Sequence, residues 1–153
     1  MRKILLAFGI AALLSAADSR PRIRAVTAFI EVDSNSYTAR IEETQKFLAS
    51  AKEAFNRAGF EGAGGRITTQ PFPLYTKGMK REDARGLIRK MRESASKGGS
   101  ALNIGPAMLR DDDDTAPVEL LTDILSDTSV NANLVMADEQ GIHWRAVREA
   151  AKL

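Results

Sequence analysis

The chain alternates between short runs of apolar residues and longer segments in which apolar residues recur every three or four positions. The first run, residues 22–33, is rich in Ile, Val, Thr and Phe, lacks Gly and ends in the turn-forming sequence Asp33-Ser34-Asn35. This composition predicts a β-strand. Three shorter apolar runs predict further strands at residues 66–70, 100–104 and 133–137.

The longer segments predict four helices, each with an apolar stripe at helical spacing. The first helix is expected over residues 37–58, with Ser36 capping its start and Gly59 ending it. Its stripe consists of Tyr37, Ile41, Leu48, Ala51 and Phe55. The other helices are predicted at residues 77–97, directly after the acidic run at residues 111–114, and from residue 141 to Leu153.

Each predicted strand is followed by a predicted helix, four times in succession. Such alternation is typical of an α/β fold with a mainly parallel sheet and right-handed crossovers. The apolar run from Leu134 to Ala137 favours a sheet that is covered on both faces. A chain of 153 residues has room for one domain. We therefore predict a single α/β domain over residues 18–153, with helices flanking the sheet.

Residues 1–17 have a different pattern from the rest of the chain. Arg2 and Lys3 lead into an apolar run, which is followed by the small residues Ser15, Ala16 and Ala17. This order is that of a secretory signal peptide, with cleavage expected after Ala16 or Ala17. The alternative is a retained N-terminal helix or an uncleaved anchor. The first interpretation predicts an exported protein, periplasmic or extracellular, with no stable membrane insertion after cleavage.

The charge balance excludes one class of partner. The formal net charge is +2, and removing Arg2 and Lys3 leaves 20 basic and 20 acidic residues. A chain without an excess of positive charge lacks the electrostatic footprint of a nucleic-acid-binding protein, so we expect no nucleic-acid partner. The sequence contains no cysteine, which excludes disulfides, thiolate metal sites and a cysteine nucleophile.

The candidate site lies where the predicted strands end. In a parallel sheet the carboxyl ends of all strands meet at one edge, and ligands bind outside that edge. This edge is expected to gather acids, amides and one imidazole that suit a small polar ligand: Asp33, Asn35, Gln70, Asn103, Gly105, Asp138 and His143. The alternative interpretation is that the Asp and Asn residues only cap the helices that follow.

No metal ion or cofactor is expected. His143 is the only histidine, which excludes a two-histidine metal centre, and no Gly-x-Ser-x-Gly elbow offers a serine nucleophile. We expect His143 to be an exposed residue in the first turn of the last helix. The acidic run at residues 111–114 lacks the spacing and the glycine of a calcium-binding loop, and is expected to be a solvated helix entry. The alternative is that it binds a divalent ion weakly. The Gly-rich turn at residues 62–65 follows a helix and precedes a strand, which is the wrong order for a phosphate loop.

Two helices carry rows of like charge. The second predicted helix carries a basic row, and the third an acidic one, each at spacings that place its members on one face. The basic row is Arg81, Arg85, Arg89 and Arg92, and the acidic row is Glu119, Asp123 and Asp127. We expect two solvated faces. The alternatives are that the rows pack against each other or against another part of the molecule.

Three short segments together resemble the domain-of-unknown-function 711 family of bacteria and archaea. They are residues 23–29 (IRAVTAF), residues 66–73 (RITTQPFP) and residues 103–107 (NIGPA). The resemblance spans residues 22–153. It implies an α/β fold related to the barrel of glycyl-radical enzymes, so that this domain would be part of a larger barrel-like fold. It implies no established activity and no catalytic residue.

The sequence departs from that family in its export-like leader and in its length, since members run to several hundred residues. Glycyl-radical chemistry needs catalytic cysteines and a glycine loop near the C-terminus, and the chain has no cysteine, so we reject that chemistry. We expect the N-terminal part of a longer protein, which self-associates or pairs with a C-terminal portion. Two hypotheses follow: a noncatalytic module that binds a small polar ligand or a partner chain, or an enzyme whose site is completed by that missing portion.

Overall fold

A computed structural model of the chain describes residues 21–153. The predicted leader at residues 1–17 lies outside them. The described elements follow in this order: β1 (Ala25–Ile30), α1 (Tyr37–Arg57), β2 (Gly64–Thr69), α2 (Phe72–Thr76), α3 (Arg81–Lys97), β3 (Ser100–Pro106), α4 (Ala116–Asp127), β4 (Asn131–Asn133), β5 (Ala137–Asp138), β6 (Gly141–Ile142) and α5 (Trp144–Ala150). Among these residues, no helix combines the length and the apolar character needed to cross a bilayer.

The main sheet has four parallel strands in the order β1-β2-β3-β4. The predicted α/β class and the parallel sheet are therefore confirmed. One row of paired residues runs across it from Phe29 through Thr68 and Asn103 to Asn131. This order places β1 at an edge of the described sheet, so the stretch predicted as the first strand has a neighbour on one side only.

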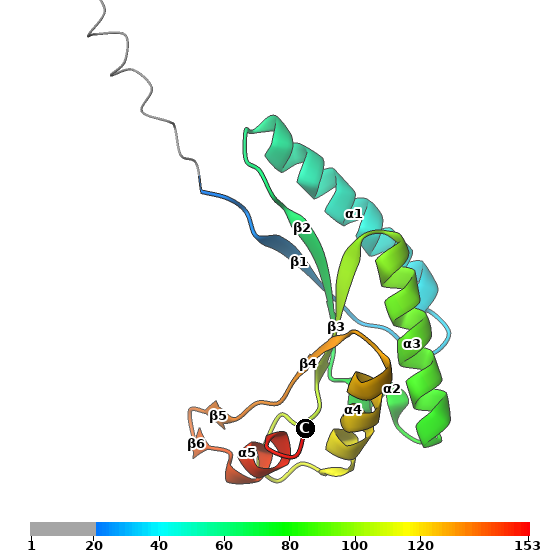
Figure 1. The fold of residues 1–153 in the computed structure, drawn as a ribbon, viewed down its shortest axis with the longest axis vertical. Helices are drawn as coiled ribbons and strands as arrows, with labels where there is room; N and C mark the ends of the chain where they lie inside the picture. The colour runs from blue at the N-terminus through cyan, green and yellow to red at the C-terminus, as the bar shows by residue number, and fades with distance from the viewer. Residues whose placement is uncertain (1–20) are drawn as a thin grey trace, which may run out of the picture.

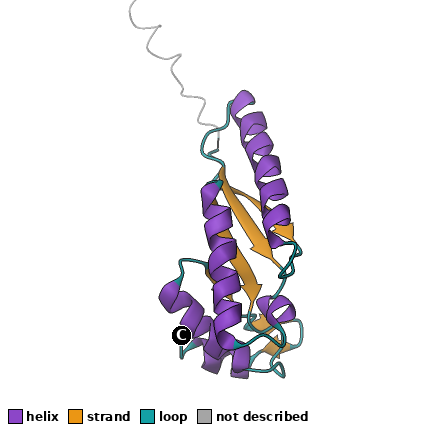
Figure 2. Cartoon of the chain, turned by 90° about the vertical axis from the view of Figure 1, so that its right-hand side faces the viewer, coloured by secondary structure: helices purple, strands orange, loops and turns teal. Residues whose placement is uncertain are grey.

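Helices α1 and α3 lie on the same side of the sheet, as Figures 1 and 2 show. Between them and the strands lies the core, in which Ile41 of α1 and Ile88 and Met91 of α3 are fully buried. The sheet contributes Ile67 and Ile104, which are also fully buried because alternate strand residues face the helices. The alternate residues of β2 and β3 face the opposite side of the sheet, and most of them are more exposed to solvent.

The exposed side chain of Phe29 illustrates this asymmetry, because 80% of its surface is accessible on β1. The expectation of a sheet covered on both faces was wrong for β1 in the described structure.

The second predicted helix, residues 77–97, begins only at Arg81 as α3, and a short helix that was not predicted precedes it. A short α2 begins at Phe72, and Gly78, with a φ of +78°, turns the chain before α3 begins at Arg81. The sequence analysis predicted a strand that ends at residue 70 and a helix that begins at residue 77, so it missed α2. Proline is also favoured in the first turn of a helix, and that signal would have located α2.

The sheet has the predicted fourth parallel strand, but its predicted bounds, residues 133–137, were wrong. The sheet pairing of β4 ends at Asn133, which lies opposite Pro106 after a register shift. The apolar residue Leu134 packs against the core without belonging to the sheet. The chain then forms the antiparallel hairpin of β5 and β6, so that α5 begins only at Trp144 and ends at Ala150.

The charged rows of α3 and α4 pack against each other. Arg81 pairs with Asp123 and lies 3.9 Å from Glu119, while Arg85 pairs with Asp127. The expectation of two separate solvated faces was wrong, and the alternative of mutual packing is confirmed. The contacts remain partly exposed, and such ion pairs each contribute little to stability, about 0–1 kcal/mol.

Candidate functional site

The loop after β1 holds two of the predicted site residues, and both take part in its turn. The Asp33 carboxylate accepts hydrogen bonds from the backbone N–H of Asn35 at 2.7 Å and of Ser36 at 2.9 Å. It also accepts one from the Ser36 hydroxyl at 2.7 Å, and this bond is the main reason that the pKa of Asp33 is lowered. Ser36 does not cap α1 with its side chain, contrary to expectation. Asp33 and Asn35 thus organise the entry to α1.

Gln70 lies at the end of β2, where its side chain is bound to the backbone of Val32. Its Oε1 accepts from the Val32 N–H at 3.1 Å, and its Nε2 donates to the Val32 carbonyl at 2.6 Å. Both polar groups of the amide are therefore engaged within the protein. Gln70 extends the pairing of β1 with β2 beyond the last backbone pair.

Asn103 and Gly105 shape the end of β3. The Asn103 Oδ1 accepts a hydrogen bond from the Gly105 N–H at 3.1 Å. Gly105 has a φ of +75°, and a Cβ at this position would lie 2.4 Å from the Gln70 carbonyl oxygen. Only glycine combines this backbone conformation with so close an approach. This edge of the sheet is held by close backbone contact.

Tyr75 of α2 lies beneath the same edge and was missed by the sequence analysis along with its helix. Its buried hydroxyl is 3.2 Å from Thr69 Oγ1 and donates to the Ile104 carbonyl at 3.3 Å. Burial raises the pKa of this phenol far above its ordinary value, so the group stays neutral. Tyr75 thus links β2 to β3 through its hydroxyl.

Asp138 and His143 lie together in the β5–β6 hairpin. The His143 Nε2 is 3.1 Å from Asp138 Oδ2, and its Nδ1 is 3.0 Å from the Val135 carbonyl oxygen. A carbonyl and a carboxylate can only accept, so both ring nitrogens must donate, and this requires the charged imidazolium. Burial opposes that charge, but the two acceptors outweigh it and raise the pKa of His143.

The expectation of an exposed histidine was wrong, since only 6% of His143 is accessible. The hairpin folds back over the ring, and the His143 N–H donates to the Met136 carbonyl at 2.9 Å. Asp138 is also held from within the turn, where it accepts from the Gln140 N–H at 2.8 Å. That bond, together with the contact to His143, lowers the pKa of Asp138 despite partial desolvation.

The acidic run is less solvated than expected, because three of its carboxylates bind backbone. Asp111 accepts from the N–H groups of Arg145 at 2.6 Å and Ala146 at 3.2 Å, at the start of α5. Asp113 accepts from the Leu109 N–H at 2.7 Å, and Asp114 from the first residue of α4. Asp111 thereby brings the acidic loop against α5 and the hairpin.

A polar pocket of about 450 Å³ lies between the acidic loop and the hairpin. It is lined by Arg110, Asp111, Asp112, Asp138, Gln140, Gly141, Ile142 and His143. Two predicted residues, Asp138 and His143, meet here, whereas the other five lie in the loop after β1, directly after β2 and within β3. The sequence analysis missed Arg110 and Gln140, although a turn ending in Gly141 indicates a hairpin.

No metal site accompanies the pocket. Within residues 21–153, no group of three or more His, Cys, Asp or Glu side chains is placed to hold a metal ion. The two ring nitrogens of His143 are already engaged, and Asp111 is occupied by backbone N–H groups. The lining side chains of Arg110, Asp112 and Gln140 form no hydrogen bond within the described residues.

A protein-family model described as "Uncharacterised ACR (DUF711)" matches residues 16–153. The chain belongs to the DUF711 family. The resemblance carried by the segments IRAVTAF, RITTQPFP and NIGPA is thereby confirmed. Comparison with curated proteins found no match, and comparison with solved structures found none.

The DUF711 segments map onto the fold in an informative way. IRAVTAF belongs to β1, RITTQPFP runs from β2 into α2, and NIGPA covers the second half of β3. The last two segments contain Gln70 and Gly105, whose backbones lie so close that a Cβ on Gly105 would be 2.4 Å from the Gln70 carbonyl oxygen. These two segments therefore hold the carboxyl edge of the sheet, and the polar pocket lies in a different part of the DUF711 chain.

Proposed function

We propose that this DUF711 chain is a noncatalytic module of an exported protein, and that it binds a small polar ligand in the pocket between the acidic loop and the hairpin. The observation that carries the proposal is the meeting of Asp138 and His143 with Arg110 and Asp112 around one polar cavity. Two of these residues come from the predicted strand-end set, and the other two lie far from them in the sequence.

The chemistry of the lining supports a ligand that carries both positive and negative or strongly accepting groups. Asp112 is exposed at the pocket and can pair with a cation, and Arg110 can bind a carboxylate through two parallel hydrogen bonds. The side chain of Gln140 can both donate and accept. A free amino acid or a small hydroxylated acid has these features.

The noncatalytic part of the proposal follows from the state of His143. A general base needs a free nitrogen near its substrate, and the imidazolium of His143 donates both protons inside the protein. The alternative, an enzyme whose site is completed by another portion, would require a different acid or base. Export is proposed from the tripartite pattern of residues 1–17.

Binding can be measured through Trp144, the only tryptophan, which is 60% exposed beside His143. We expect the fluorescence of Trp144 to titrate with at least one member of a panel of free amino acids and hydroxy acids. Asp112→Asn should weaken that binding about tenfold or more, the effect of losing roughly 1.4 kcal/mol. Asp83→Asn, an equal change on the exposed first turn of α3, serves as the control. No titration with any ligand, or equal effects of both variants, would refute the proposal.

A further inference from the structure

The outer edge of β1 is an unpaired strand edge within the described residues. Val32 directs its N–H and carbonyl toward Gln70, and the Arg24 carbonyl accepts from Gly64, so these backbone groups face β2. Because backbone groups of successive strand residues point in opposite directions, Thr27 and Phe29 present theirs to the outer edge. Such an edge is a template for another strand.

The charges that flank β1 indicate which strand fits. Arg22 and Arg24 precede the strand, Glu31 and Asp33 follow it, and all four residues are exposed. If β1 of a second copy pairs antiparallel, the acidic residues that follow each strand lie beside the basic residues that precede the other. The opposite charges therefore meet at both ends of the pair. A parallel copy would place like charges together. The edge is therefore complementary to itself in the antiparallel direction.

We propose that two copies of this chain associate through β1, antiparallel, about a two-fold axis near Thr27. The two four-stranded sheets then form one continuous sheet. A two-fold interface uses the same surface on both copies, which is what the charge pattern of a single strand supplies. The pairing is independent of the polar pocket, which lies near the opposite edge of the sheet beyond β4.

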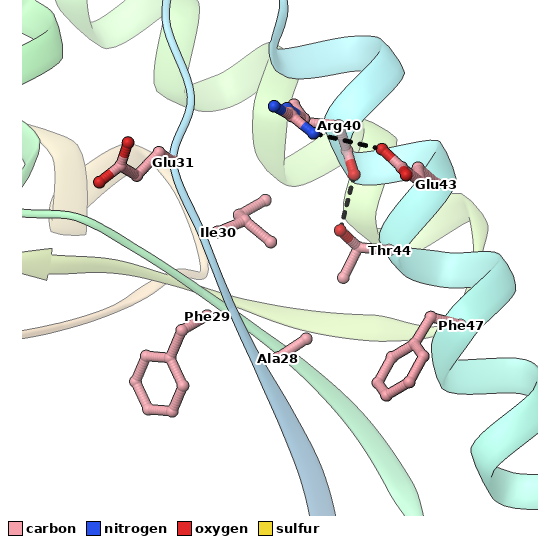
Figure 3. Close-up of a pocket in the computed structure, with 8 residues that line it drawn as sticks. All are labelled: Ala28, Phe29, Ile30, Glu31, Arg40, Glu43, Thr44 and Phe47. Atoms are coloured by element: carbon pink, nitrogen blue, oxygen red, sulfur yellow. Dashed lines mark hydrogen bonds and ion pairs between the residues drawn. The ribbon is translucent and has the colours of Figure 1, made fainter.

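The helix above β1 supports this arrangement. Helix α1 contacts both β1 and β2, and a groove of about 590 Å³ lies between α1 and the edge strand. Figure 3 shows Thr44 and Phe47 of α1 on the same side of the strand as Ala28, with the ring of Phe29 on the other side. Phe47 is 60% exposed, so the groove has an apolar and uncovered wall.

Elementary spacing shows that the two copies of α1 would meet. Neighbouring strands lie about 4.8 Å apart, so a helix above the line between β1 and β2 lies about 5 Å from the two-fold axis. The axes of the two α1 helices would then be about 10 Å apart, which is the distance at which helices pack. Phe47 of each copy would face the groove of the other. The groove is thus filled by the association itself.

Sedimentation equilibrium of the full chain over a range of concentrations tests the proposal. We expect a mass that approaches twice 16.7 kDa as the concentration rises. Thr27→Pro removes one outward N–H and leaves the pairing with β2 intact, because proline is tolerated on an edge strand whose N–H faces away from its neighbour. This variant should remain near 16.7 kDa at the same concentrations. Circular dichroism verifies that it is folded.

A charge exchange tests the direction of the pairing and decides the case if Thr27→Pro fails to fold. Arg24→Glu alone should weaken the association about tenfold or more, and the double variant Arg24→Glu with Glu31→Arg should restore it. Lys90→Glu, the same charge change on the exposed surface of α3, is the control and should have no effect. A monomeric wild type would overturn the proposal. The outer edge of β1 would then be open only to a strand from a different polypeptide. A dimer that none of these substitutions in β1 weakens would also overturn it.

Discussion

The side chain of Gln70 pairs with the backbone of Val32 as though it were one more residue of the sheet. The amide donates to the Val32 carbonyl and accepts from the Val32 N–H, at 2.6 and 3.1 Å. Val32 is 5% exposed and follows the last backbone pair of β1 with β2. The chain leaves β1 at this point to enter the loop to α1, so the amide holds the strand end where that loop begins.

Replacing this amide should destabilise the fold. Gln70→Ala leaves both backbone groups of Val32 without their partners, and each buried polar group that loses its partner costs about 1–3 kcal/mol. We expect urea denaturation to show a loss of about 2–6 kcal/mol for the two groups together. Gln70→Glu, which keeps only the acceptor, should lie between Gln70→Ala and the wild type. Gln140→Ala, at an exposed turn residue, is the control and should change stability by less than about 0.5 kcal/mol. A cost that small for Gln70→Ala would mean that water replaces the amide.

Leu48 provides a test of the face that α1 turns to the sheet. It is 5% exposed and lies against Gly65 of β2. Leu48→Ala should cost about 2–5 kcal/mol in unfolding free energy because it opens a cavity in the core. Lys46→Ala, two positions earlier on the exposed face, should cost less than about 0.5 kcal/mol. Equal costs for the two variants would contradict the packing of α1 described above.

The hairpin should respond to pH through His143. The folded state raises the pKa of His143 above its ordinary value of 6.5. The stabilisation of the fold by protonated His143 is therefore complete below pH 6.5 and is lost as the pH rises through the folded-state pKa. Asp138 has a lowered pKa, so its contribution is present above its ordinary value of 3.8 and is lost as pH falls through the folded-state pKa. The ion pair therefore contributes most between these two ordinary values.

Thermal denaturation of the wild type and of His143→Asn across pH measures this effect. We expect the difference in Tm to be largest near pH 5 to 6 and to shrink as the solution becomes alkaline, because the neutral ring can no longer donate to both acceptors. Asp138→Asn should show the same loss of pH dependence. A difference that stays constant from pH 5 to 9 would show that His143 is not held as an imidazolium.

Export predicts a new N-terminus. Mass spectrometry of the protein recovered from its native host should find a chain that begins at Ala17 or Asp18, in a periplasmic or extracellular fraction. Replacing Ala16 and Ala17 with bulky residues should block this processing, because the cleaving enzyme requires small side chains. An intact Met1, or protein found only in the cytosol, would show that residues 1–17 are not a cleaved signal peptide.

The site was only partly predictable from the chain. Asp138 and His143 were recognised as polar residues near the end of a predicted strand, and they do line the polar pocket. They reach the pocket for a different reason, because the sheet strand ends at Asn133 and a separate short hairpin, β5 with β6, follows it. Asp33 and Gln70 were recognised by the same rule, yet each is bound within its own loop or to a neighbouring strand. Strand-end position shows where polar side chains gather, and it does not show which of them remain free.

The sequence by itself determined the parts of this protein that depend on local pattern. The apolar spacing of residues 37–58 and the β-branched run before Asp33 specify a helix and a strand wherever they lie, and their alternation favours a parallel sheet. Gly59, with a φ of +80°, ends α1 where its lack of a Cβ allows the turn.

The tertiary structure decided what depends on neighbours far along the chain. Which strand lies at the edge is a matter of pairing order, and no periodicity within β1 encodes it. The charge of His143 also depends on folding, although Val135 and Asp138 lie only eight and five residues earlier, because the hairpin must close over the ring. The acidic row of α4 is neutralised by arginines 38 to 42 residues earlier. Such contacts depend on the closure of long loops, whose outcome the sequence around each residue does not contain.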